Sequence, residues 1–363
     1  MSKTPSKHAT PKNGKIKKVL LCLLAILLSI VLAVAGTVTV LYLQGRSSLL
    51  DRGEVSIITP ESLPGMSTDT SSESAEDETD TISYQGKTYR FNDNVVSILV
   101  MGIDKESLQE EGATGVNGQA DTLLLTTVDT VTGEIVVIPL SRDTMAEVDL
   151  YSTDGQLIGS EIMQLCLAYA YSDNNEDSCH NVCRSVSRLL YGVPIDSYIA
   201  IDVAGVEVAT DMLGGVPVTV LEDIAYKRRQ VYLDKGDKVT LDGRKAIGYI
   251  RYRGKDVDAN NRRMQRQKQF FTAFINKAAK NLKKDATQLL NYYSTVQPYV
   301  VSDLDVSEIT YLAGVSLLNR KQLSLEFGQI VGKSIKVEQY AEFHPDKQSV
   351  YEAVLKAFYR EVV

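Results

Sequence analysis

The chain has 363 residues, of which 44% are hydrophobic, 46 are Asp or Glu, 39 are Lys or Arg, and only 3 are His. This length accommodates one large domain or two small ones. The net charge of -7 argues against a general nucleic-acid-binding protein, and the scarcity of histidine excludes chemistry built on several histidines, such as a three-His zinc site.

The N-terminal region has the pattern of a membrane anchor. Residues 1–18 form a basic tail with six lysines and no acid, and residues 19–43 form an uncharged run of Leu, Val, Ile and Ala. A helix of 25 residues would rise about 37 Å, enough to cross a hydrocarbon core of about 30 Å. Since the lysines precede the span, we expect a cytoplasmic N-terminus, a single pass through the cell membrane and an extracellular C-terminal domain. The alternative is a signal peptide cleaved near Ala33-Val34-Ala35.

Residues 44–83 are acidic, rich in Ser and Thr and poor in aromatic residues. Such a segment buries too little apolar surface to fold, so we predict a stalk. The composition becomes typical of a globular protein from Tyr84, and we assign residues 84–363 to one extracellular domain.

The predicted elements of this domain alternate between strands and helices. Short apolar runs predict strands over residues 95–102, 122–128, 134–140, 198–201 and 216–221, with a hairpin turn at 129–133. Apolar positions at helical spacing predict helices over residues 162–170, 182–190, 203–213, 265–282, 306–318 and 349–359. This order indicates an α/β fold of mixed α+β layers, in which helices flank a central β-sheet.

Positive charge is concentrated in one part of this acidic domain. Residues 227–268 contain 14 basic and 5 acidic residues. Arg251 and Arg253 are two positions apart, on one side of the chain if the backbone is extended, and Arg263, Arg266 and Gln267 share one face of a helix. Arginine suits bidentate recognition of phosphate, so we expect an anion of more than one charge to bind here. A solvated basic face is the alternative.

Carboxylates follow or precede the predicted strands. Asp104 comes directly after the first strand, Asp121 directly before the second, and Arg142 and Asp143 after the third. Two carboxylates together with a phosphate form a typical Mg²⁺ site. Taken singly, each Asp is equally typical of a turn or a helix cap.

Six short motifs in this order resemble those of the LytR-CpsA-Psr family. They are Gly102-Ile103-Asp104, Ala120-Asp121-Thr122, Ser141-Arg142-Asp143-Thr144, Leu167-Ala168-Tyr169-Ala170-Tyr171, Leu213-Gly214-Gly215-Val216, and Arg251-Tyr252-Arg253 followed by Arg263-x-x-Arg266-Gln267. The similarity covers roughly residues 95–280, and the layout of anchor and stalk also matches.

The resemblance implies a Gram-positive envelope phosphotransferase that moves a glycopolymer from a polyprenyl pyrophosphate carrier onto peptidoglycan through a phosphodiester. It implies that Asp104 and Asp121 hold Mg²⁺ or Mn²⁺ and that Asp258 is a further acid facing the site. It also implies an apolar pocket for the lipid tail. The residues that would bind the pyrophosphate are Arg142, Arg251, Arg253, Arg263 and Gln267.

Phosphoryl transfer needs charge neutralisation and in-line positioning more than a special nucleophile, so arginine and a metal ion suffice without histidine. Arg142 is the residue that we expect to be essential. If the acceptor hydroxyl needs a base, a carboxylate must supply it, and Asp121 and Asp143 are the candidates. Gln119 stands where many members of the family have arginine, and it is a further candidate for pyrophosphate binding. Glutamine can hydrogen-bond a phosphate but brings no charge, so we expect weaker pyrophosphate binding than with arginine.

Three cysteines lie outside the predicted span, where an oxidising environment preserves disulfides. Because three cysteines cannot all pair with one another, we predict one disulfide. Cys166 would pair with Cys179 or Cys183. A zinc site around Cys179-His180-x-x-Cys183 lacks a second pair of ligands and is the weaker interpretation.

Three other functions fit parts of the pattern. The chain could be a polyprenyl-pyrophosphate hydrolase, a non-catalytic lipid-binding envelope protein, or a transcriptional attenuator, a label that the family carries. An extracellular domain cannot contact DNA, and a cytoplasmic tail of 18 residues is too short for a DNA-binding fold. The sequence does not distinguish teichoic acid from capsule polysaccharide as the polymer.

Overall fold

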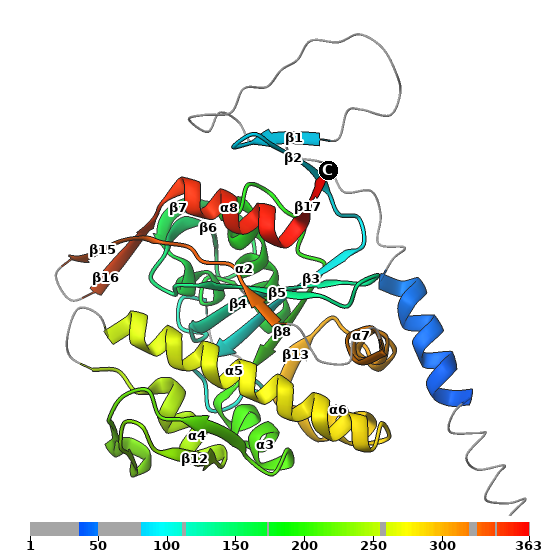
Figure 1. Cartoon of the computed structure of the whole chain (residues 1–363). Coiled ribbons are helices and arrows are strands. Elements are labelled where there is room, and N and C mark those ends of the chain that lie inside the picture. Colours follow the sequence, from blue (N-terminus) through cyan, green and yellow to red (C-terminus); the bar gives the residue numbers. More distant parts are fainter. Residues whose placement is uncertain are drawn as a thin grey trace, which may run out of the picture.

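The computed structural model describes residues 36–49, 81–110, 114–172, 174–254, 259–318, 325–337 and 340–362. Most of the predicted span, most of the predicted stalk and Asp258 lie outside these residues. Residues 36–49 form a helix, shown in blue in Figure 1. Among the described helices, none combines the length and the apolar character that crossing a bilayer requires.

A six-stranded mixed sheet forms the centre of the molecule (Figure 1). Its strand order is β13-β8-β3-β4-β5-β14. β4 pairs antiparallel with both β3 and β5, whereas β8 is parallel to β3 and β14 is parallel to β5. The strands are β3 (Val95–Ile103), β4 (Ala120–Asp129), β5 (Ile135–Leu140), β8 (Ser197–Ile201), β13 (Val300–Ser302) and β14 (Leu325–Phe327).

Both faces of this sheet are buried, which explains why its strands are continuous apolar runs. Along β3, Leu99 and Met101 pack into one hydrophobic cluster, and Val96 and Ile98 pack into another on the opposite face. The first cluster includes side chains of α2 (Asn175–Leu189) and α8 (Lys347–Phe358). The second includes side chains of α7 (Val306–Leu318) and the 36–49 helix. The central sheet is therefore covered by helices on both sides, as predicted.

Smaller elements surround this core. The helices are α3 (Val203–Met212), α4 (Gly243–Arg251), α5 (Ala259–Lys284) and α6 (Gln288–Val296), with the 3₁₀ helices η1 (Leu165–Tyr169), η2 (Lys227–Arg229) and η3 (Gln297–Tyr299). One small sheet contains β1 (Thr81–Tyr84), β2 (Lys87–Phe91) and β17 (Tyr359–Val362). The remaining strands pair as β6 (Met145–Tyr151) with β7 (Leu157–Gln164), β9 (Val216–Thr219) with β12 (Lys238–Leu241), β10 (Ile224–Tyr226) with β11 (Val231–Leu233), and β15 (Gly332–Val337) with β16 (Tyr340–Pro345).

Side-chain caps fix the starts of the helices near the site. Asp202 accepts a hydrogen bond from the Gly205 backbone N–H at the start of α3, and Asp242 accepts one from the Lys245 N–H at the start of α4. Each cap satisfies one of the N–H groups that have no partner inside the helix. The caps therefore define where α3 and α4 begin, and α4 leads into the arginines of the site.

The predicted helix over residues 162–170 is wrong in its first part. Ile162 belongs to β7, where it pairs with Glu147 of β6 and is 66% exposed. A short 3₁₀ helix, η1, begins only at Leu165. The apolar spacing of this segment misled the prediction because Ile162 lies on the exposed face of a hairpin and not in a helix packed on the core.

The 36–49 helix packs directly on α7. The rings of Tyr42 and Tyr311 meet edge to face with centroids 5.1 Å apart, and the Ser48 hydroxyl donates a hydrogen bond to Glu308 at 2.6 Å. Leu49 is 5% exposed. A Cβ on Gly45 would lie 2.0 Å from the Ser307 carbonyl oxygen. The close packing of two helix backbones therefore depends on this glycine.

The predicted disulfide is absent, because the three cysteines in the described part of the chain are free thiols. The predicted pairing of Cys166, in η1, with Cys179 or Cys183, both on α2, is therefore wrong. The Cys166 N–H donates to the carbonyl oxygen of Arg142 at 3.1 Å, which holds that cysteine at the β5–β6 connection. Burial raises the pKa of Cys183 to about 12, so its thiol is neutral at physiological pH.

Candidate functional site

Three strand ends meet at one edge of the central sheet and carry the predicted carboxylates. Because β4 runs antiparallel to β3 and β5, its start lies beside the ends of those two strands. Asp104 follows β3, Asp121 is the second residue of β4, and Arg142 and Asp143 follow β5. The Asp104 backbone N–H donates to the Gln119 carbonyl oxygen at 2.9 Å, which joins the first two of these ends. The sheet therefore brings together residues that are up to 39 positions apart in the sequence.

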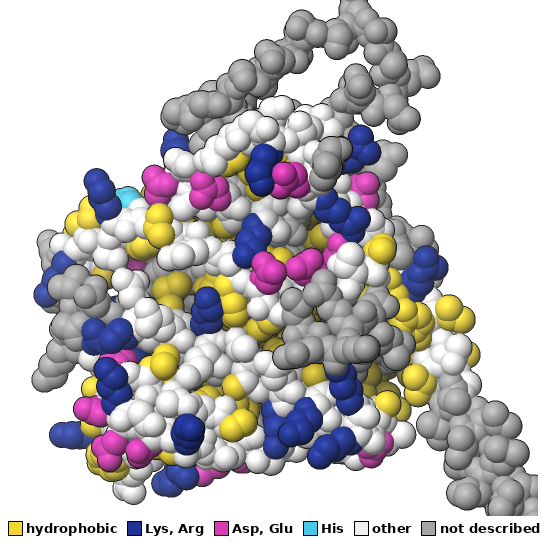
Figure 2. Space-filling model, in the orientation of Figure 1, with side chains coloured by type: hydrophobic (Ala, Val, Ile, Leu, Met, Phe, Trp, Pro, Cys, Tyr) yellow, Lys and Arg dark blue, Asp and Glu magenta, His cyan; other side chains and the backbone are white. Residues whose placement is uncertain are grey.

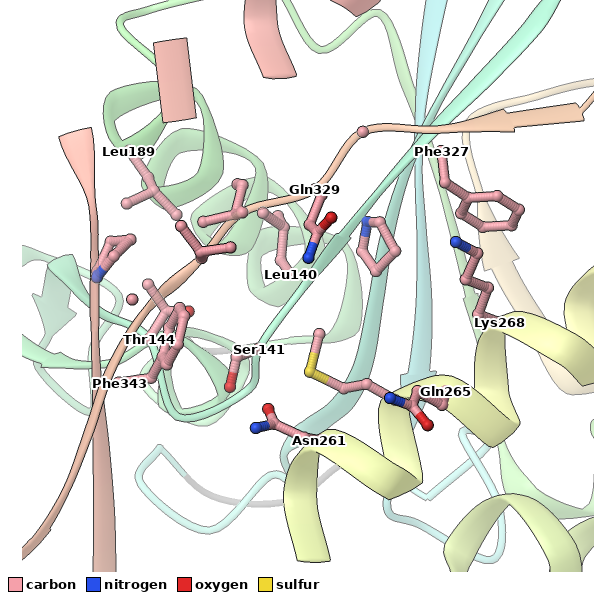
Figure 3. Close-up of a pocket in the computed structure, with 17 residues that line it drawn as sticks. Leu140, Ser141, Thr144, Leu189, Asn261, Gln265, Lys268, Phe327, Gln329 and Phe343 are labelled. Atoms are coloured by element: carbon pink, nitrogen blue, oxygen red, sulfur yellow. The ribbon is translucent and has the colours of Figure 1, made fainter. Parts of the chain in front are cut away.

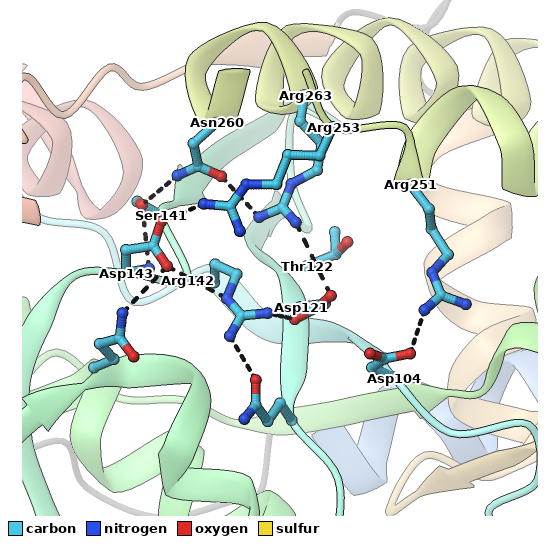
Figure 4. Close-up of polar contacts among 12 residues, drawn as sticks. Asp104, Asp121, Thr122, Ser141, Arg142, Asp143, Arg251, Arg253, Asn260 and Arg263 are labelled. Atoms are coloured by element: carbon cyan, nitrogen blue, oxygen red, sulfur yellow. Dashed lines mark hydrogen bonds and ion pairs between the residues drawn. The ribbon is translucent and has the colours of Figure 1, made fainter. Parts of the chain in front are cut away.

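Arg142 lies at the centre of this edge, between two carboxylates (Figure 4). Its Nη1 pairs with Asp121, its Nη2 donates to the side-chain oxygen of Gln119, and its Nε lies 3.4 Å from Asp143 Oδ1. The Asp143 side chain also accepts a hydrogen bond from Gln164 Nε2 at 3.4 Å. Gln119 thus orients Arg142 through an uncharged hydrogen-bond acceptor, at the position where the family resemblance led us to expect arginine.

Helix α5 contributes a second buried arginine to the same site. Arg263 Nη1 lies 4.0 Å from Asp121 Oδ2, and Arg263 Nη2 donates to Asn260 Oδ1 at 2.7 Å. Asn260 in turn donates to the Ser141 hydroxyl at 3.1 Å. Burial, together with the neighbouring positive charges of Arg142 and Arg253, lowers the pKa of Arg263 to about 10. The site thus destabilises the charged form of this arginine, and a bound anion would restore it.

Two buried guanidinium nitrogens, Arg142 Nε and Arg263 Nε, make no hydrogen bond to any described residue, although Arg142 Nε lies 3.4 Å from Asp143 Oδ1 in an ion pair. A buried donor without a partner costs free energy, so an acceptor supplied by a ligand would stabilise the site. These two donors and the low pKa of Arg263 both indicate an anion-binding site.

Arg251 and Arg253 reach the site from the end of α4. Arg251 is the last residue of that helix and pairs with Asp104, whereas Arg253 Nη2 lies 3.9 Å from Asp143 Oδ2. The expectation that both lie on one side of an extended chain is therefore wrong, because a helix ends between them. Arg253 lies beside Arg263 and above Arg142, whereas Arg251 lies apart from these three, next to Asp104 (Figure 4).

The two other α5 residues of the predicted cluster have different positions. Gln267 is 8% exposed and donates a hydrogen bond to the Thr122 hydroxyl at 2.8 Å, so its side chain lies next to the residue that follows Asp121. Arg266 is 1% exposed and pairs with Glu222, away from the carboxylates of the site. The structure thus assembles five of the predicted pyrophosphate residues and Gln119 around Asp121 and Asp143, and Arg266 lies behind them.

Asp104 and Asp121 are the residues that we expected to hold a magnesium ion. Both line one small cavity of about 40 Å³, together with Thr122, Arg251 and Gln267. This cavity has room for a water-sized species, and Mg²⁺ in phosphoryl-transfer sites is bound by one or two carboxylates plus the substrate phosphates. Within the described ranges, no group of three or more His, Cys, Asp or Glu residues could hold a metal ion by itself. The two carboxylates alone would not complete the coordination of a metal ion, and the oxygens of a bound phosphate would be needed as further ligands.

An apolar groove begins beside the arginines and runs along α5 (Figure 3). It has a volume of about 480 Å³ and includes Ser141 and Asn261 at the end near the site. Its walls are mainly apolar and come from β5, α2, α5 and the segment around β14, β15 and β16: Pro139, Leu140, Leu189, Met264, Phe327, Ile330, Val331 and Phe343. Figure 2 shows hydrophobic side chains in a hollow alongside α5 on this face. At the far end, Lys268 Nζ lies 4.0 Å from the centroid of the Phe327 ring.

A model of the LytR_cpsA_psr family matches residues 65–357. The chain belongs to the LytR-CpsA-Psr family. The resemblance predicted from the six motifs is therefore confirmed, and the match extends well beyond residues 95–280.

Characterised relatives of this LytR-CpsA-Psr protein are polyisoprenyl-teichoic acid–peptidoglycan teichoic acid transferases. TagV of Bacillus subtilis is 29% identical over 195 residues, which cover 52% of this chain and 45% of TagV. TagU of Enterococcus faecalis is 23% identical over 248 residues, which cover 68% of this chain and 70% of TagU. The chain thus spans about half the length of several of the relatives that it matches.

Solved structures have the same fold. The crystal structure of B. subtilis TagV superposes with a TM-score of 0.57 at 22% identity, covering 73% of this chain and 96% of that chain. The structure of TagT bound to LIIa-WTA gives a TM-score of 0.54 at 22% identity, covering 73% and 89%. The mixed sheet with flanking helices is therefore the fold of LytR-CpsA-Psr proteins.

Three residues of this LytR-CpsA-Psr site were not predicted as site residues. Ser141 and Asn260 bridge Asp143 and Arg263, because the Asp143 N–H donates to the Ser141 hydroxyl at 3.3 Å. Gln164 holds Asp143 from the end of β7. Asn260 precedes Arg263 by three positions on one helix, which was a usable signal. Nothing in the sequence pattern indicated Gln164.

Proposed function

We propose that this protein transfers a teichoic-acid-type glycopolymer from a polyprenyl pyrophosphate carrier to peptidoglycan, at the outer face of the cell membrane. The observation that carries this proposal is the junction of the arginine site with the apolar groove. Ser141 lines the groove and is also bonded to Asn260 within the arginine site. A ligand with a doubly charged head and a hydrocarbon tail matches this junction, and the names of the relatives support the reaction class.

The groove would hold the first isoprene units of the carrier. Its apolar walls remove hydrocarbon from water, which contributes about 25 cal/mol per Å² of buried apolar surface. Because the groove leads away from Arg142 along α5, a tail lying in it places the pyrophosphate among the arginines. The remainder of a long polyprenyl chain would stay in the bilayer.

The arginines would bind and orient the pyrophosphate. Arg263 is buried, the Arg142 side chain is 14% exposed, and the Nε atoms of both make no hydrogen bond to the described residues. Arg251 pairs with Asp104, and Arg253 approaches Asp143. Four guanidinium groups neutralise the charge that develops on the phosphoryl oxygens and on the leaving group during transfer. Mg²⁺ held by Asp104 and Asp121 would supply further charge neutralisation on the phosphate oxygens.

The reaction replaces one phosphorus–oxygen bond with another. The acceptor hydroxyl oxygen attacks the phosphorus that bears the polymer, the bridging bond of the pyrophosphate breaks, and polyprenyl monophosphate leaves. The proton of the acceptor hydroxyl must pass to a base. The Asp121 side chain is 21% exposed and the Asp143 side chain 5%, so Asp121 is the better placed to receive it and Asp143 to orient Arg142 and Arg253.

Incubation of the full-length protein with a polyprenyl-pyrophosphate-linked saccharide, Mg²⁺ and peptidoglycan fragments tests this proposal. Saccharide covalently linked to peptidoglycan, with release of polyprenyl monophosphate, is the expected result. Polyprenyl monophosphate and a phosphorylated saccharide without the linked product would identify a hydrolase, and no turnover at all would identify a lipid-binding protein. Either of these outcomes overturns the transferase.

A further inference from the structure

Arg266 is the most deeply buried arginine of α5, and its guanidinium group contacts the backbone of another helix. Its Nε donates to the Tyr249 carbonyl oxygen at 2.7 Å, and its Nη2 donates to the Tyr252 carbonyl oxygen. Its Nη1 pairs with Glu222. The rings of Tyr249 and Tyr252 lie beside the guanidinium group, with centroids 6.0 and 5.5 Å from its carbon. All three nitrogens are therefore used for contacts outside the carboxylate cluster.

The two carbonyl groups that Arg266 holds flank Arg251. Tyr249 lies in the last turn of α4, Arg251 ends that helix, and Tyr252 is its C-terminal cap residue. The last carbonyls of a helix have no partner inside the helix, and a positive charge is favourable near them. Gln267, the next residue of α5, lies 3.5 Å from the Ile250 carbonyl oxygen through its Nε2. Side chains of α5 thus hydrogen-bond backbone carbonyl groups before and after Arg251.

We propose that Arg266, braced by Glu222, is a positioning residue that ends α4 at Arg251 and thereby directs Arg251 to Asp104 and Arg253 to Asp143. This inference rests on the proposed function, because it concerns how the same site is arranged. The helix ends because Tyr252, the C-cap residue, has φ -54° and ψ 135°, which are not helical values. The chain turns there, and Arg253 approaches Asp143.

Only arginine can make this set of contacts. A lysine has one nitrogen and no planar fork, so it cannot bond two carbonyl groups and a carboxylate in one plane. Burying this charge is also costly, because desolvation lowers the pKa of Arg266 to about 10. Apolar side chains of similar volume often replace buried ion pairs without loss of stability. The geometry of the α4 end, more than stability, therefore accounts for an arginine here.

Arg262 provides a matched control for the test. It lies on the same helix and its Nε pairs with the same Glu222 at 2.7 Å, but its side chain is 35% exposed. We expect Arg266→Lys to weaken the binding of inorganic pyrophosphate in the presence of Mg²⁺ about tenfold and to raise KM for the lipid substrate, whereas Arg262→Lys stays within about twofold of wild type. Unchanged pyrophosphate affinity in a folded Arg266→Lys protein would overturn the inference, even if that variant melts at a lower temperature.

A mutant cycle separates positioning from general destabilisation. If Arg266 acts through the two arginines, Arg266→Lys should weaken pyrophosphate binding no further in a protein that already carries Arg251→Ala and Arg253→Ala. A full additional loss in that background would show that Arg266 acts otherwise. If Arg266→Lys does not fold, Glu222→Gln takes its place in the same cycle, with the same two outcomes. Wild-type protein that binds no pyrophosphate would instead contradict the proposed function.

Discussion

Arg251 and Arg253 are separated by one residue, yet they pair with carboxylates at different strand ends. Arg251 contacts Asp104 after β3, and Arg253 approaches Asp143 after β5. Arg142 pairs with Asp121 and also lies 3.4 Å from the Asp143 carboxylate. The site is thus a cluster of paired charges whose cations come from a strand end and two helices. A pyrophosphate bound in this cluster would exchange carboxylate partners for phosphate oxygens at several arginines at once.

Arg142 should be the most sensitive residue of this cluster. Arg142→Ala removes the central cation, and we expect turnover to fall at least about 100-fold, because groups that neutralise developing charge contribute on that scale. The protein should still fold, with a lower melting temperature because Asp121 and Asp143 lose a positive partner. Arg228→Ala serves as the control, because that side chain is 67% exposed. Turnover at the wild-type rate in Arg142→Ala would contradict the assignment of this cluster as the active site.

Gln119→Arg tests the departure from the usual family pattern. The new cation would face Arg142, so the protein without ligand should lose thermal stability. Pyrophosphate should bind more tightly than in wild type, because a fifth positive charge becomes available to it. Isothermal titration calorimetry at low and high salt would measure this, and the gain should shrink at high salt. Gln119→Leu, which only removes the acceptor of Arg142, should bind more weakly; tighter binding by that variant would contradict this role of Gln119.

The apolar groove can be filled without touching the arginines. Met264→Trp adds volume at the groove wall, so KM for polyprenyl pyrophosphate substrates should rise several-fold, while the affinity for inorganic pyrophosphate stays the same. Met264→Leu keeps the volume nearly constant and should behave as wild type. Equal losses of lipid and inorganic pyrophosphate binding in Met264→Trp would mean that the groove is not a separate subsite.

Asp149 should make stability depend on acid pH. It is 3% exposed, and burial alone would raise its pKa, but hydrogen bonds from Arg188, Ser160 and Arg184 lower the pKa below its ordinary value. A carboxyl with a lowered folded-state pKa stabilises the protein above its unfolded pKa of about 3.9, and this contribution is lost as the pH falls through the folded value. Asp149→Asn should therefore cost about 1–3 kcal/mol at pH 7 and much less near pH 3. Thermal melts at both pH values measure the difference, and an equal cost at both would refute it.

Two glycines of the 36–49 helix should respond to the same substitution with opposite signs. A Cβ on Gly45 would meet the backbone of α7, whereas a Cβ on Gly36 meets nothing within 4 Å. Gly45→Ala should therefore loosen the helix from α7 and lower the melting temperature. Gly36→Ala should leave stability unchanged or raise it, since alanine favours helix by up to about 1 kcal/mol over glycine. Hydrogen exchange of residues 306–310 would report the loosening, and equal exchange in both variants would contradict the observed packing.

Much of the central architecture could be predicted because it depends on local patterns. The hairpin of β4 and β5 follows from two apolar runs around a polar turn, and the site carboxylates follow from their positions at strand ends. The strand β14 could not be predicted, because its parallel pairing with β5 joins residues about 190 positions apart. The opposite directions of Arg251 and Arg253 also escaped prediction, since they depend on where α4 ends, and that end is held by Arg266 from another helix. The cysteine pairing failed because sequence spacing carries no information about Cβ separation.

Residues 325–345, which form part of the groove, are synthesised after the residues of the arginine site. The carboxylates and arginines of the site are complete once the chain has emerged through Arg263, but Phe327, Val331 and Phe343, which close the groove, come about 60 to 80 residues later. During synthesis from the N-terminus, the head-group site can form before the chamber for the hydrocarbon exists. If the protein binds a lipid carrier as proposed, a nascent chain that ends before residue 325 lacks the walls that would hold the hydrocarbon tail.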